Sequence, residues 1–471
     1  MNRTLKRPMF KMGGSTNSGI VSGLNKPRQQ YSEGSKPRQQ YSEGTTLERL
    51  QKAAGARDFG IEEFLIPFGL VTGPFLPDLF LSLIALIFVL ESFKNNKFDY
   101  IKSKFSIVFF LFYFLIIISS LLSNHILFSL ENSILYIRYF FFAFGVYYLC
   151  VNKPETINIF SKFLFYTVLI VVIDGYIEFL FGKNILGRGS PDPSRILSFF
   201  HAMIIGSYLS KILPLMFIFL IFQQRSPILF KLIYIFIGFL YVLIFLSGER
   251  SAFVHASITF VFLSLLIKET RKLFTLSSTL IILILITLIN TNDVIKKRMF
   301  ISVWDGFDIQ NLSQSFKLDN IIFFTPVHDR FIRASFDIFK DNKIIGSGPN
   351  TFRHECSNYS KIIDYWNGKE TLKISCTTHP HNTYAQLLSE TGIIGFSVIV
   401  FVYLFLLFLL LKYITFKKDQ DTYLKICLLM YFLIALFPFT PTGNFFNNWV
   451  SAIYFLPLGI FLSKFNLNGK K

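Results

Sequence analysis

Residues 329–352 read DRFIRASFDIFKDNKIIGSGPNTF, and residues 378–396 read THPHNTYAQLLSETGIIGF. From His328 to the end of the second motif the chain holds four of its seven histidines and two of its four cysteines. Most of the sequence around this segment is apolar. Charged and titratable side chains are costly inside a bilayer, so a polar segment of this kind is where a functional site is expected.

The composition excludes a soluble globular protein. The 471 residues include 59 phenylalanines, and the mean hydropathy is +0.49. Apolar runs recur along the chain, each near the roughly 20 residues that a helix needs to cross the bilayer core. The first run begins only near Phe59, so no cleavable signal peptide is expected. Four cysteines in a chain of this length do not indicate a disulfide scaffold.

The net charge of +18 does not indicate a nucleic-acid partner. Eleven Lys and Arg residues lie in residues 1–57, and most of the others lie in short loops between apolar runs. This pattern is typical of charges that orient a membrane protein beside anionic lipid, so the expected partner is the lipid bilayer.

The apolar runs predict an all-α polytopic membrane protein with about twelve transmembrane helices. The predicted spans are roughly residues 60–73, 78–92, 105–123, 130–150, 157–181, 199–222, 228–247, 250–267, 273–290, 391–411, 422–438 and 448–463. The corresponding domains are a disordered basic tail over 1–57, helices 1–9 within 58–290, one large loop domain over 291–390, helices 10–12 within 391–464, and a short tail over 465–471. The first tail duplicates KPRQQYSEG, and it is either a basic segment lying on the inner leaflet or a dispensable extension.

The charges of the loops predict the orientation. The basic short loops are residues 93–104, 151–156, 223–231, 268–272 and 412–425, whereas 124–129 and 439–447 contain no Lys or Arg. With twelve spans and both termini cytoplasmic, every basic short loop lies inside. The polar segments 182–198, 247–251 and 291–390 then lie on the periplasmic face.

These periplasmic segments contain cations on the side where positive charge is disfavoured. The candidate residues are Arg188, Arg195, Arg250, Arg330 and Arg333, together with the histidines His379 and His381. An anionic ligand would explain them, because the planar guanidinium fork donates two hydrogen bonds at once to phosphate. The alternative is ordinary ion pairing, with Asp329 or Asp337 for Arg333 and with Glu249 for Arg250.

The motif HPHNT at residues 379–383 leads into a predicted helix. Asn382 or Thr383 can cap this helix, and Gly392 marks a break before the next span. A histidine at such a position can accept a proton from an attacking hydroxyl, and a purely structural histidine is the alternative. A zinc site is disfavoured because the available ligands lack the paired short intervals of zinc motifs. Those ligands would be His354, Cys376, His379 and His381, and no metal is expected.

Two further features leave two interpretations each. The turn GSGPN at 346–350 either presents backbone N–H groups to phosphate or is a plain turn. Asp174 and Glu178, four residues apart inside one span, either pair with Arg138 or serve catalysis. Cys356 and Cys376 are the two cysteines of the loop domain. If the loop is periplasmic, they are candidates for a disulfide.

Four pieces in this order resemble the O-antigen ligase-like membrane protein family, which also includes O-antigen and other polysaccharide polymerases. They are Arg195 ahead of the segment ending GSYLS, the SGERSA turn with Arg250, the DRFIRASF–GSGPNTF motif and the HPHNTYAQLLSETGIIGF motif. The similar region runs from about residue 59 to 464. The N-terminal tail departs from the family pattern, and of the two histidines only His381, next to Asn382, matches it.

The resemblance implies a glycosyltransferase of the GT-C type that needs no nucleotide sugar, metal or other cofactor. Such enzymes take a glycan from undecaprenyl diphosphate at the periplasmic face of the bacterial inner membrane. Ligases pass it to lipid A–core, and polymerases pass it to another lipid-linked glycan. Within this picture Arg195, Arg250 and His381 are the catalytic candidates, and Arg188, Arg330, Arg333, His379 and Asn382 are the substrate-binding candidates. A transporter of a small anion is the alternative from another class; it would place its ionisable residues near the bilayer midplane.

The orientation is testable with reporter fusions. Fusions at Lys102 and Arg271 should report a cytoplasmic position and a fusion at Lys369 a periplasmic one, because only this arrangement keeps the basic loops inside. A cytoplasmic signal at Lys369 would contradict the predicted topology.

Overall fold

The computed structural model describes residues 61–301, 326–359, 362–365, 370–373, 376–416 and 419–465. Residues Phe59–Lys471 form one compact unit. The predicted tail over 1–57, and all but the first residue of the predicted tail over 465–471, lie outside the described residues.

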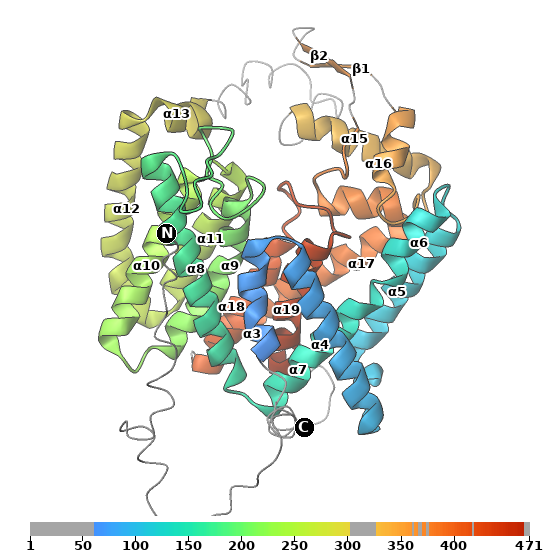
Figure 1. The fold of residues 1–471 in the computed structure, drawn as a ribbon, viewed down its shortest axis with the longest axis horizontal. Helices are drawn as coiled ribbons and strands as arrows, with labels where there is room; N and C mark the ends of the chain where they lie inside the picture. Colours follow the sequence, from blue (N-terminus) through green and yellow to red (C-terminus); the bar gives the residue numbers. More distant parts are fainter. Residues whose placement is uncertain are drawn as a thin grey trace, which may run out of the picture. The chain divides into compact units, whose positions relative to one another are not determined.

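The described chain is almost entirely helical (Figure 1). The long helices before the large loop are α3 (Ile61–Thr72), α4 (Phe75–Lys94), α5 (Lys104–Leu121), α6 (Ile126–Ile134), α7 (Ile137–Asn152), α8 (Thr156–Phe181), α9 (Ile205–Phe222), α10 (Pro227–Leu246), α11 (Arg250–Leu266) and α12 (Arg271–Thr291). After that loop come α17 (Thr383–Ile414), α18 (Gln420–Ala435) and α19 (Asn448–Phe465). Short helical turns are η1 (Asp99–Lys102), η2 (Lys268–Thr270), α13 (Asp293–Lys296) and η3 (Lys297–Ile301).

Nine segments in the described part of the chain are long and apolar enough to cross a membrane. These are α4, α5, the α6–α7 segment Ile126–Asn152, α8, α9, α10, Lys268–Thr291, α17 and α19. The other predicted spans are helices of 12, 17 and 16 residues, α3, α11 and α18. They are shorter than the about 20 residues that a full crossing needs. A multi-pass α-helical membrane protein is thus confirmed; nine of the twelve predicted spans are long and apolar enough to cross a membrane, and α3, α11 and α18 are shorter.

Burial separates the centre of the bundle from its lipid-facing edge. Some 89% of the apolar stretch of α9 is buried, whereas only 6% of the apolar stretch of Lys268–Thr291 is buried. Among the nine candidate spans, the segment that contains α12 is therefore the most open to lipid. In Figure 1 α12 runs along one edge, and α18 and α19 lie between the two halves. The α7–α19 contact is close because Gly459 has no side chain: a Cβ there would lie 2.4 Å from Val146. Small residues of this kind let membrane helices approach.

The start of α9 differs from the prediction, because the predicted span over 199–222 becomes helical only at Ile205. Two buried carboxylates on α8 hold the preceding segment as a loop. Glu178 accepts the Leu197 amide at 3.0 Å and also the Ser198 amide, and Asp174 accepts the Ser198 hydroxyl at 2.7 Å.

One of the two interpretations from the sequence expected Arg138 to pair with these carboxylates. It does not. It forms an ion pair with Asp78 of α4 at 2.8 Å. Asp174 and Glu178 are satisfied by the loop after α8, which the sequence alone did not indicate.

The described part of the large loop forms a small cap above the bundle. It consists of α15 (Pro326–Asp341), α16 (Phe352–Glu355), η6 (Cys356–Tyr359), the antiparallel pair β1 (Ile362–Tyr365) and β2 (Glu370–Lys373), and the segment 376–382 that leads into α17. Its own core contains Phe331, Ala334, Ile338, Phe352 and Cys356. The two short strands were not part of the all-α prediction.

Helix α17 begins at Thr383, where the sequence predicted a capped helix, and it continues through the span that was predicted from residue 391. The helix axis breaks at Gly392, whose φ is 64°. The predicted break at this glycine is therefore present, and the helix continues on both sides of it. A Cβ at Gly392 would lie 2.3 Å from the Ile344 carbonyl oxygen, which is why the position suits glycine.

The GSGPN turn at 346–350 binds the cap to the bundle. The amides of Asn350 and Phe352 donate to the buried Glu390 carboxylate at 2.9 and 3.0 Å, and the Gly348 amide donates to the Glu390 carbonyl at 3.0 Å. Ser129 of α6 donates to the Pro349 carbonyl at 3.1 Å. These N–H groups are occupied, so the turn holds the cap in place rather than presenting them to phosphate.

Gly348→Ala should weaken this attachment. The φ of Gly348 is 108°, and a Cβ would lie 2.7 Å from the Ser123 hydroxyl and 2.9 Å from the Ser129 hydroxyl. We expect a loss of about 1–3 kcal/mol in stability, measured as a lower melting temperature of the purified protein. Gly182→Ala is the control: its φ is also positive, 75°, but nothing lies within 4 Å of the added Cβ. Equal shifts in the two variants would show that the overlap with the two serines costs nothing.

Candidate functional site

Two groups of titratable side chains lie at the end of the bundle that carries the cap. The arginine group consists of Arg195, Arg250 and Arg298, around the start of α11. The histidine group consists of His328, His379 and His381, between the cap and the start of α17. In Figure 1 the loop between α8 and α9, helix α13 and the cap all lie at this end.

Arg195 is held from one side only. One terminal nitrogen donates to the Met203 carbonyl at 2.7 Å and lies 3.6 Å from the Glu249 carboxylate. The Nε atom is buried and has no hydrogen-bond partner. A buried N–H without a partner is costly, so this atom marks a place where a ligand oxygen would be stabilised.

Glu249 fixes the geometry around Arg195. It is buried and accepts the amides of Gly206 and Ser207 at 2.9 and 3.0 Å, as well as the Ser207 hydroxyl. These groups belong to the first turn of α9, where a negative charge also suits the helix dipole. A Cβ on Gly206 would lie 3.0 Å from the Glu249 Cβ, so glycine permits the approach. Glu249 thus interacts with Arg195 and accepts hydrogen bonds from the start of α9, and it makes no ion pair with Arg250.

Arg250 is the first residue of α11 and is half-buried. No described residue forms a hydrogen bond or an ion pair with its guanidinium. Arg298 of η3 lies near enough for the two positive charges to repel. Arg298 donates to the Gly248 carbonyl at 3.2 Å and lies 3.7 Å from Asp192. The alternative that Arg250 is simply paired with Glu249 is therefore wrong.

Two members of this neighbourhood were not predicted from the sequence. Arg298 is the last residue of the basic run at 296–298, which matches no motif. Lys211 is buried in α9, one turn after Ser207, and it interacts electrostatically with Glu249 and His255. A lysine inside an apolar run is the signal that could have identified it.

The Asp192 carboxylate belongs to the same neighbourhood. The Ser194 hydroxyl and amide donate to it at 2.6 and 2.9 Å. These hydrogen bonds, followed by the charges of Arg298 and Arg195, lower the pKa of Asp192 below its ordinary value. Three guanidinium groups therefore face only two carboxylates, Asp192 and Glu249, and an excess of positive charge remains.

The three histidines of the second group lie close together. The His381 ring is 4.1 Å from that of His379 and 5.5 Å from that of His328, with Phe331 at 5.7 Å. Burial is the main cause that lowers the pKa of His379 to about 3 and that of His328 to about 4, and it also lowers the pKa of His381. All three rings are thus neutral near pH 7, and neutral imidazole is the form that can accept a proton.

His379 and His381 have different surroundings. His379 Nε2 lies 3.3 Å from the Thr442 carbonyl oxygen, and Nδ1 lies 3.0 Å from the Thr378 hydroxyl. A carbonyl oxygen only accepts, so Nε2 carries the proton and both ring nitrogens are occupied. The His381 ring forms no hydrogen bond with a described residue. Its backbone has a φ of 54°, and its carbonyl accepts the Thr442 amide at 2.8 Å. Strained backbone of this kind is common at functional sites.

The loop between α18 and α19 lies between the two groups. Thr442 contacts His379 and His381 as described above, while the Thr440 hydroxyl lies 3.0 Å from Nε2 of His255 on α11. Arg250 begins the same helix. The loop therefore links the helix of the arginine group to the histidine segment.

The other predicted residues have structural partners. Asn382 caps α17 by accepting the amides of Tyr384 and Ala385, both at 3.0 Å, and it donates to the Pro438 carbonyl at 2.8 Å. Arg333 pairs with Asp329 at 2.7 Å, as its alternative interpretation expected.

Arg330 and Arg188 differ in their exposure. Arg330 is buried, with its guanidinium 6.0 Å from the centre of the Phe331 ring. The Arg188 side chain is exposed. In the described residues no group of three His, Cys, Asp or Glu side chains has the geometry of a metal site.

A disulfide joins Cys356 to Cys376, with their Cα atoms 5.6 Å apart. Cys356 belongs to the core of the cap, and Cys376 lies three residues before His379. The disulfide therefore connects the histidine segment to the packed part of the cap.

The lowered pKa of His379 predicts that acid destabilises this end of the molecule. The unfolded chain binds a proton near pH 6.5, whereas folded His379 does so only near pH 3. Because the unfolded state binds more protons between these values, stability falls as the pH drops, by up to about 1.4 kcal/mol per pH unit for one histidine. Melting temperatures measured from about pH 7 to pH 5 should therefore fall less steeply in His379→Asn than in the wild type. His201→Asn, at an exposed ring, is the control; equal slopes in all three proteins would contradict the assignment.

No curated protein matches the chain. The family model described as O-antigen ligase matches residues 232–400. This region includes Arg250, Arg298, the cap and both histidines of the 379–383 motif, and it ends within α17. The predicted resemblance is confirmed for this region: residues 232–400 of this multi-pass membrane protein are similar to the O-antigen ligase family of surface polysaccharide synthesis.

Proposed function

We propose that the protein transfers a glycan from undecaprenyl diphosphate to an acceptor at the periplasmic face of the bacterial inner membrane. The observation that carries this proposal is the arginine group. Arg250 has no partner among the described residues, and Arg195 has a buried Nε without a hydrogen bond. These unoccupied donors suit the oxygens of a diphosphate, which guanidinium groups bind in pairs.

In this reaction the bond between the anomeric carbon and the diphosphate oxygen breaks. Negative charge grows on the leaving diphosphate, and the arginine group lies where it can stabilise that charge. Fixed donors in a site with little water are effective because they need no rearrangement in the transition state. Removal of one comparable donor typically costs about 10²–10³ in rate.

His381 is the candidate for the acceptor side of the reaction. Its ring is neutral near pH 7 and has no hydrogen bond to a described residue, whereas both nitrogens of His379 are occupied. His381 can therefore accept the proton of the attacking hydroxyl or orient that hydroxyl. General base catalysis of this kind contributes roughly 10²–10⁴.

The acceptor distinguishes the two forms of the proposal. A lipid A–core acceptor makes the protein a ligase, and another lipid-linked glycan makes it a polymerase of the same family. Both use the same donor and the same leaving group, so the arginine and histidine groups serve either. The proposal also includes a GT-C-like fold for the helical bundle and a cytoplasmic position for both termini.

A transporter of a small anion is less well supported. Such proteins place their ionisable groups near the midplane of the bilayer between repeated halves. Here Arg195, Arg250 and Arg298 gather at the cap end instead.

The proposal predicts distinct effects for four substitutions. Arg250→Ala should reduce glycan transfer about 10²–10³-fold, and Arg250→Lys should fail nearly as badly because an ammonium lacks the planar fork. His381→Ala should cost roughly 10²–10⁴, whereas His379→Ala should act mainly through stability. The assay is transfer from undecaprenyl-diphosphate-linked glycan by the purified protein, with no divalent metal added.

Lys183→Ala is the matched control, since this cation is exposed in the loop after α8 at the same end and has no assigned role. Full activity in a well-folded His381→Ala protein would refute the acceptor role. Full activity in Arg250→Ala would refute the diphosphate site.

A further inference from the structure

A fourth arginine, which sequence analysis did not single out, lies beside the histidine group. Arg353 belongs to α16, and its charge contributes to lowering the pKa of His379. One terminal nitrogen donates to the Asn350 side-chain oxygen at 2.9 Å, and the guanidinium carbon lies 5.5 Å from the centre of the Phe128 ring. The Nε atom is buried without a hydrogen-bond partner.

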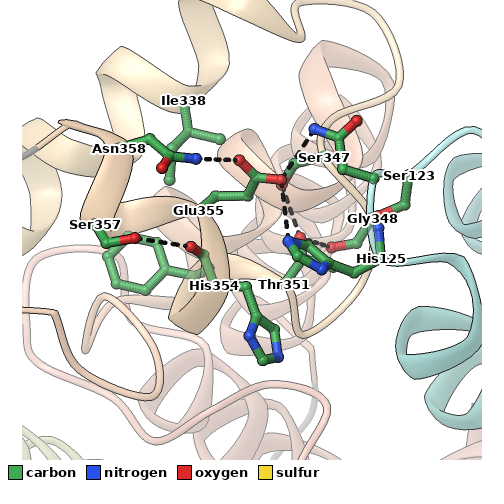
Figure 2. A network of polar contacts seen from close by, with 12 residues as sticks. Ser123, His125, Ile338, Ser347, Gly348, Thr351, His354, Glu355, Ser357 and Asn358 are labelled. Atoms are coloured by element: carbon green, nitrogen blue, oxygen red, sulfur yellow. Dashed lines mark hydrogen bonds and ion pairs between the residues drawn. The ribbon is translucent and has the colours of Figure 1, made fainter.

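Arg353 has no carboxylate partner in the described part of the chain, although two carboxylates lie nearby. Glu390 is occupied by the Asn350 and Phe352 amides and by Gln386, which donates at 3.0 Å. Glu355 lies 3.5 Å from His125 and accepts a hydrogen bond from Asn358 at 3.3 Å (Figure 2). The guanidinium therefore forms no ion pair with a described carboxylate, although its charge interacts electrostatically with Glu390.

A network of side-chain amides fixes the position of Arg353. The Asn350 oxygen accepts from Arg353 and also from Asn444 at 2.8 Å, and the Asn350 nitrogen donates to Asn132 at 3.1 Å. Gln386 donates to Asn444 at 2.7 Å. These groups come from α6, the cap, α17 and the loop before α19. Side chains from these segments thus hold Asn350, and Asn350 accepts the hydrogen bond from Arg353.

Aromatic rings lie next to this arginine. The His354 ring is 4.7 Å from the Phe128 ring and 4.7 Å from the His125 ring. The flat faces of a phenylalanine and two imidazole rings beside hydrogen-bond donors are a suitable surface for a sugar. The Asn444 that braces the arginine is two residues from Thr442, which contacts both His379 and His381.

We propose that Arg353 binds an acidic group, the carboxylate of a uronic acid or a phosphate substituent, on a sugar of the glycan substrate. That the ligand is a glycan rests on the proposed function. Guanidinium binds both kinds of oxyanion through paired hydrogen bonds. Arg353 is then a determinant of which glycans the enzyme accepts, separate from the arginine group that faces the diphosphate.

The test is direct binding of small probes to the full-length protein in nanodiscs, measured by ligand-observed NMR titration. The probes are methyl glucuronide, glucose 6-phosphate and the neutral methyl glucoside. We expect at least one acidic probe to bind about tenfold to a hundredfold more tightly than the neutral one, as charge-assisted hydrogen bonds predict. The acidic probe that is preferred identifies the carboxylate or the phosphate as the natural group.

Three variants locate the binding. Arg353→Gln should abolish the preference for acidic probes, and Arg353→Lys should retain only part of it because the fork is lost. Lys343→Gln, at an exposed cation of the cap to which no binding role is assigned, should leave it unchanged. If Arg353→Gln lowers the melting temperature so far that it does not fold, the comparison of Arg353→Lys with the wild type decides.

Equal binding of acidic and neutral probes to the wild type would overturn the proposal. So would an unchanged preference in Arg353→Gln, or a preference that disappears only in Arg250→Gln. Binding of the probes does not require glycan transfer. A protein that shows the expected preference but transfers no glycan therefore refutes the proposed function and supports an acidic-sugar site.

Discussion

Burial of carboxylates at the cap end is the constraint on which the rest of the structure depends. An ionised carboxylate removed from water must find hydrogen-bond donors inside the protein. Glu178, Glu249 and Glu390 each find them in the backbone amides of a distant segment. The same contacts therefore satisfy the charge and fix the loop after α8, the start of α9 and the GSGPN turn.

The cations at this end differ from one another in their partners. Arg138 and Arg333 have carboxylate partners within the described chain and contribute to the fold. Arg250 and Arg353 form no ion pair with a described carboxylate, and Arg195 lies 3.6 Å from Glu249, a carboxylate that also accepts the amides at the start of α9. This difference in ion pairing, more than the position in the sequence, separates structural arginines from those that are candidates for binding substrate.

The same distinction applies to the paired histidines of the HPHNT motif. His379 is held through both ring nitrogens, whereas the His381 ring is positioned only by its backbone and by neighbouring rings. The disulfide between Cys356 and Cys376 and the contacts of Thr442 hold this segment in place. A rigid support around one unoccupied ring is what a proton-accepting residue needs.

The sequence alone determined the features that depend on neighbours along the chain. The apolar runs located the helices, Asn382 was identified as a cap, Gly392 as a break, and the spacing of Asp329 and Arg333 allowed their ion pair. Only the tertiary structure decided which distant groups meet. Arg138 found Asp78 rather than Asp174 or Glu178, Glu249 found the start of α9 rather than Arg250, and Arg298, Lys211 and Arg353 emerged as members of the site. The physical reason is that helix periodicity and capping are local, whereas a buried charge is satisfied by whichever donor the packing of the bundle brings to it.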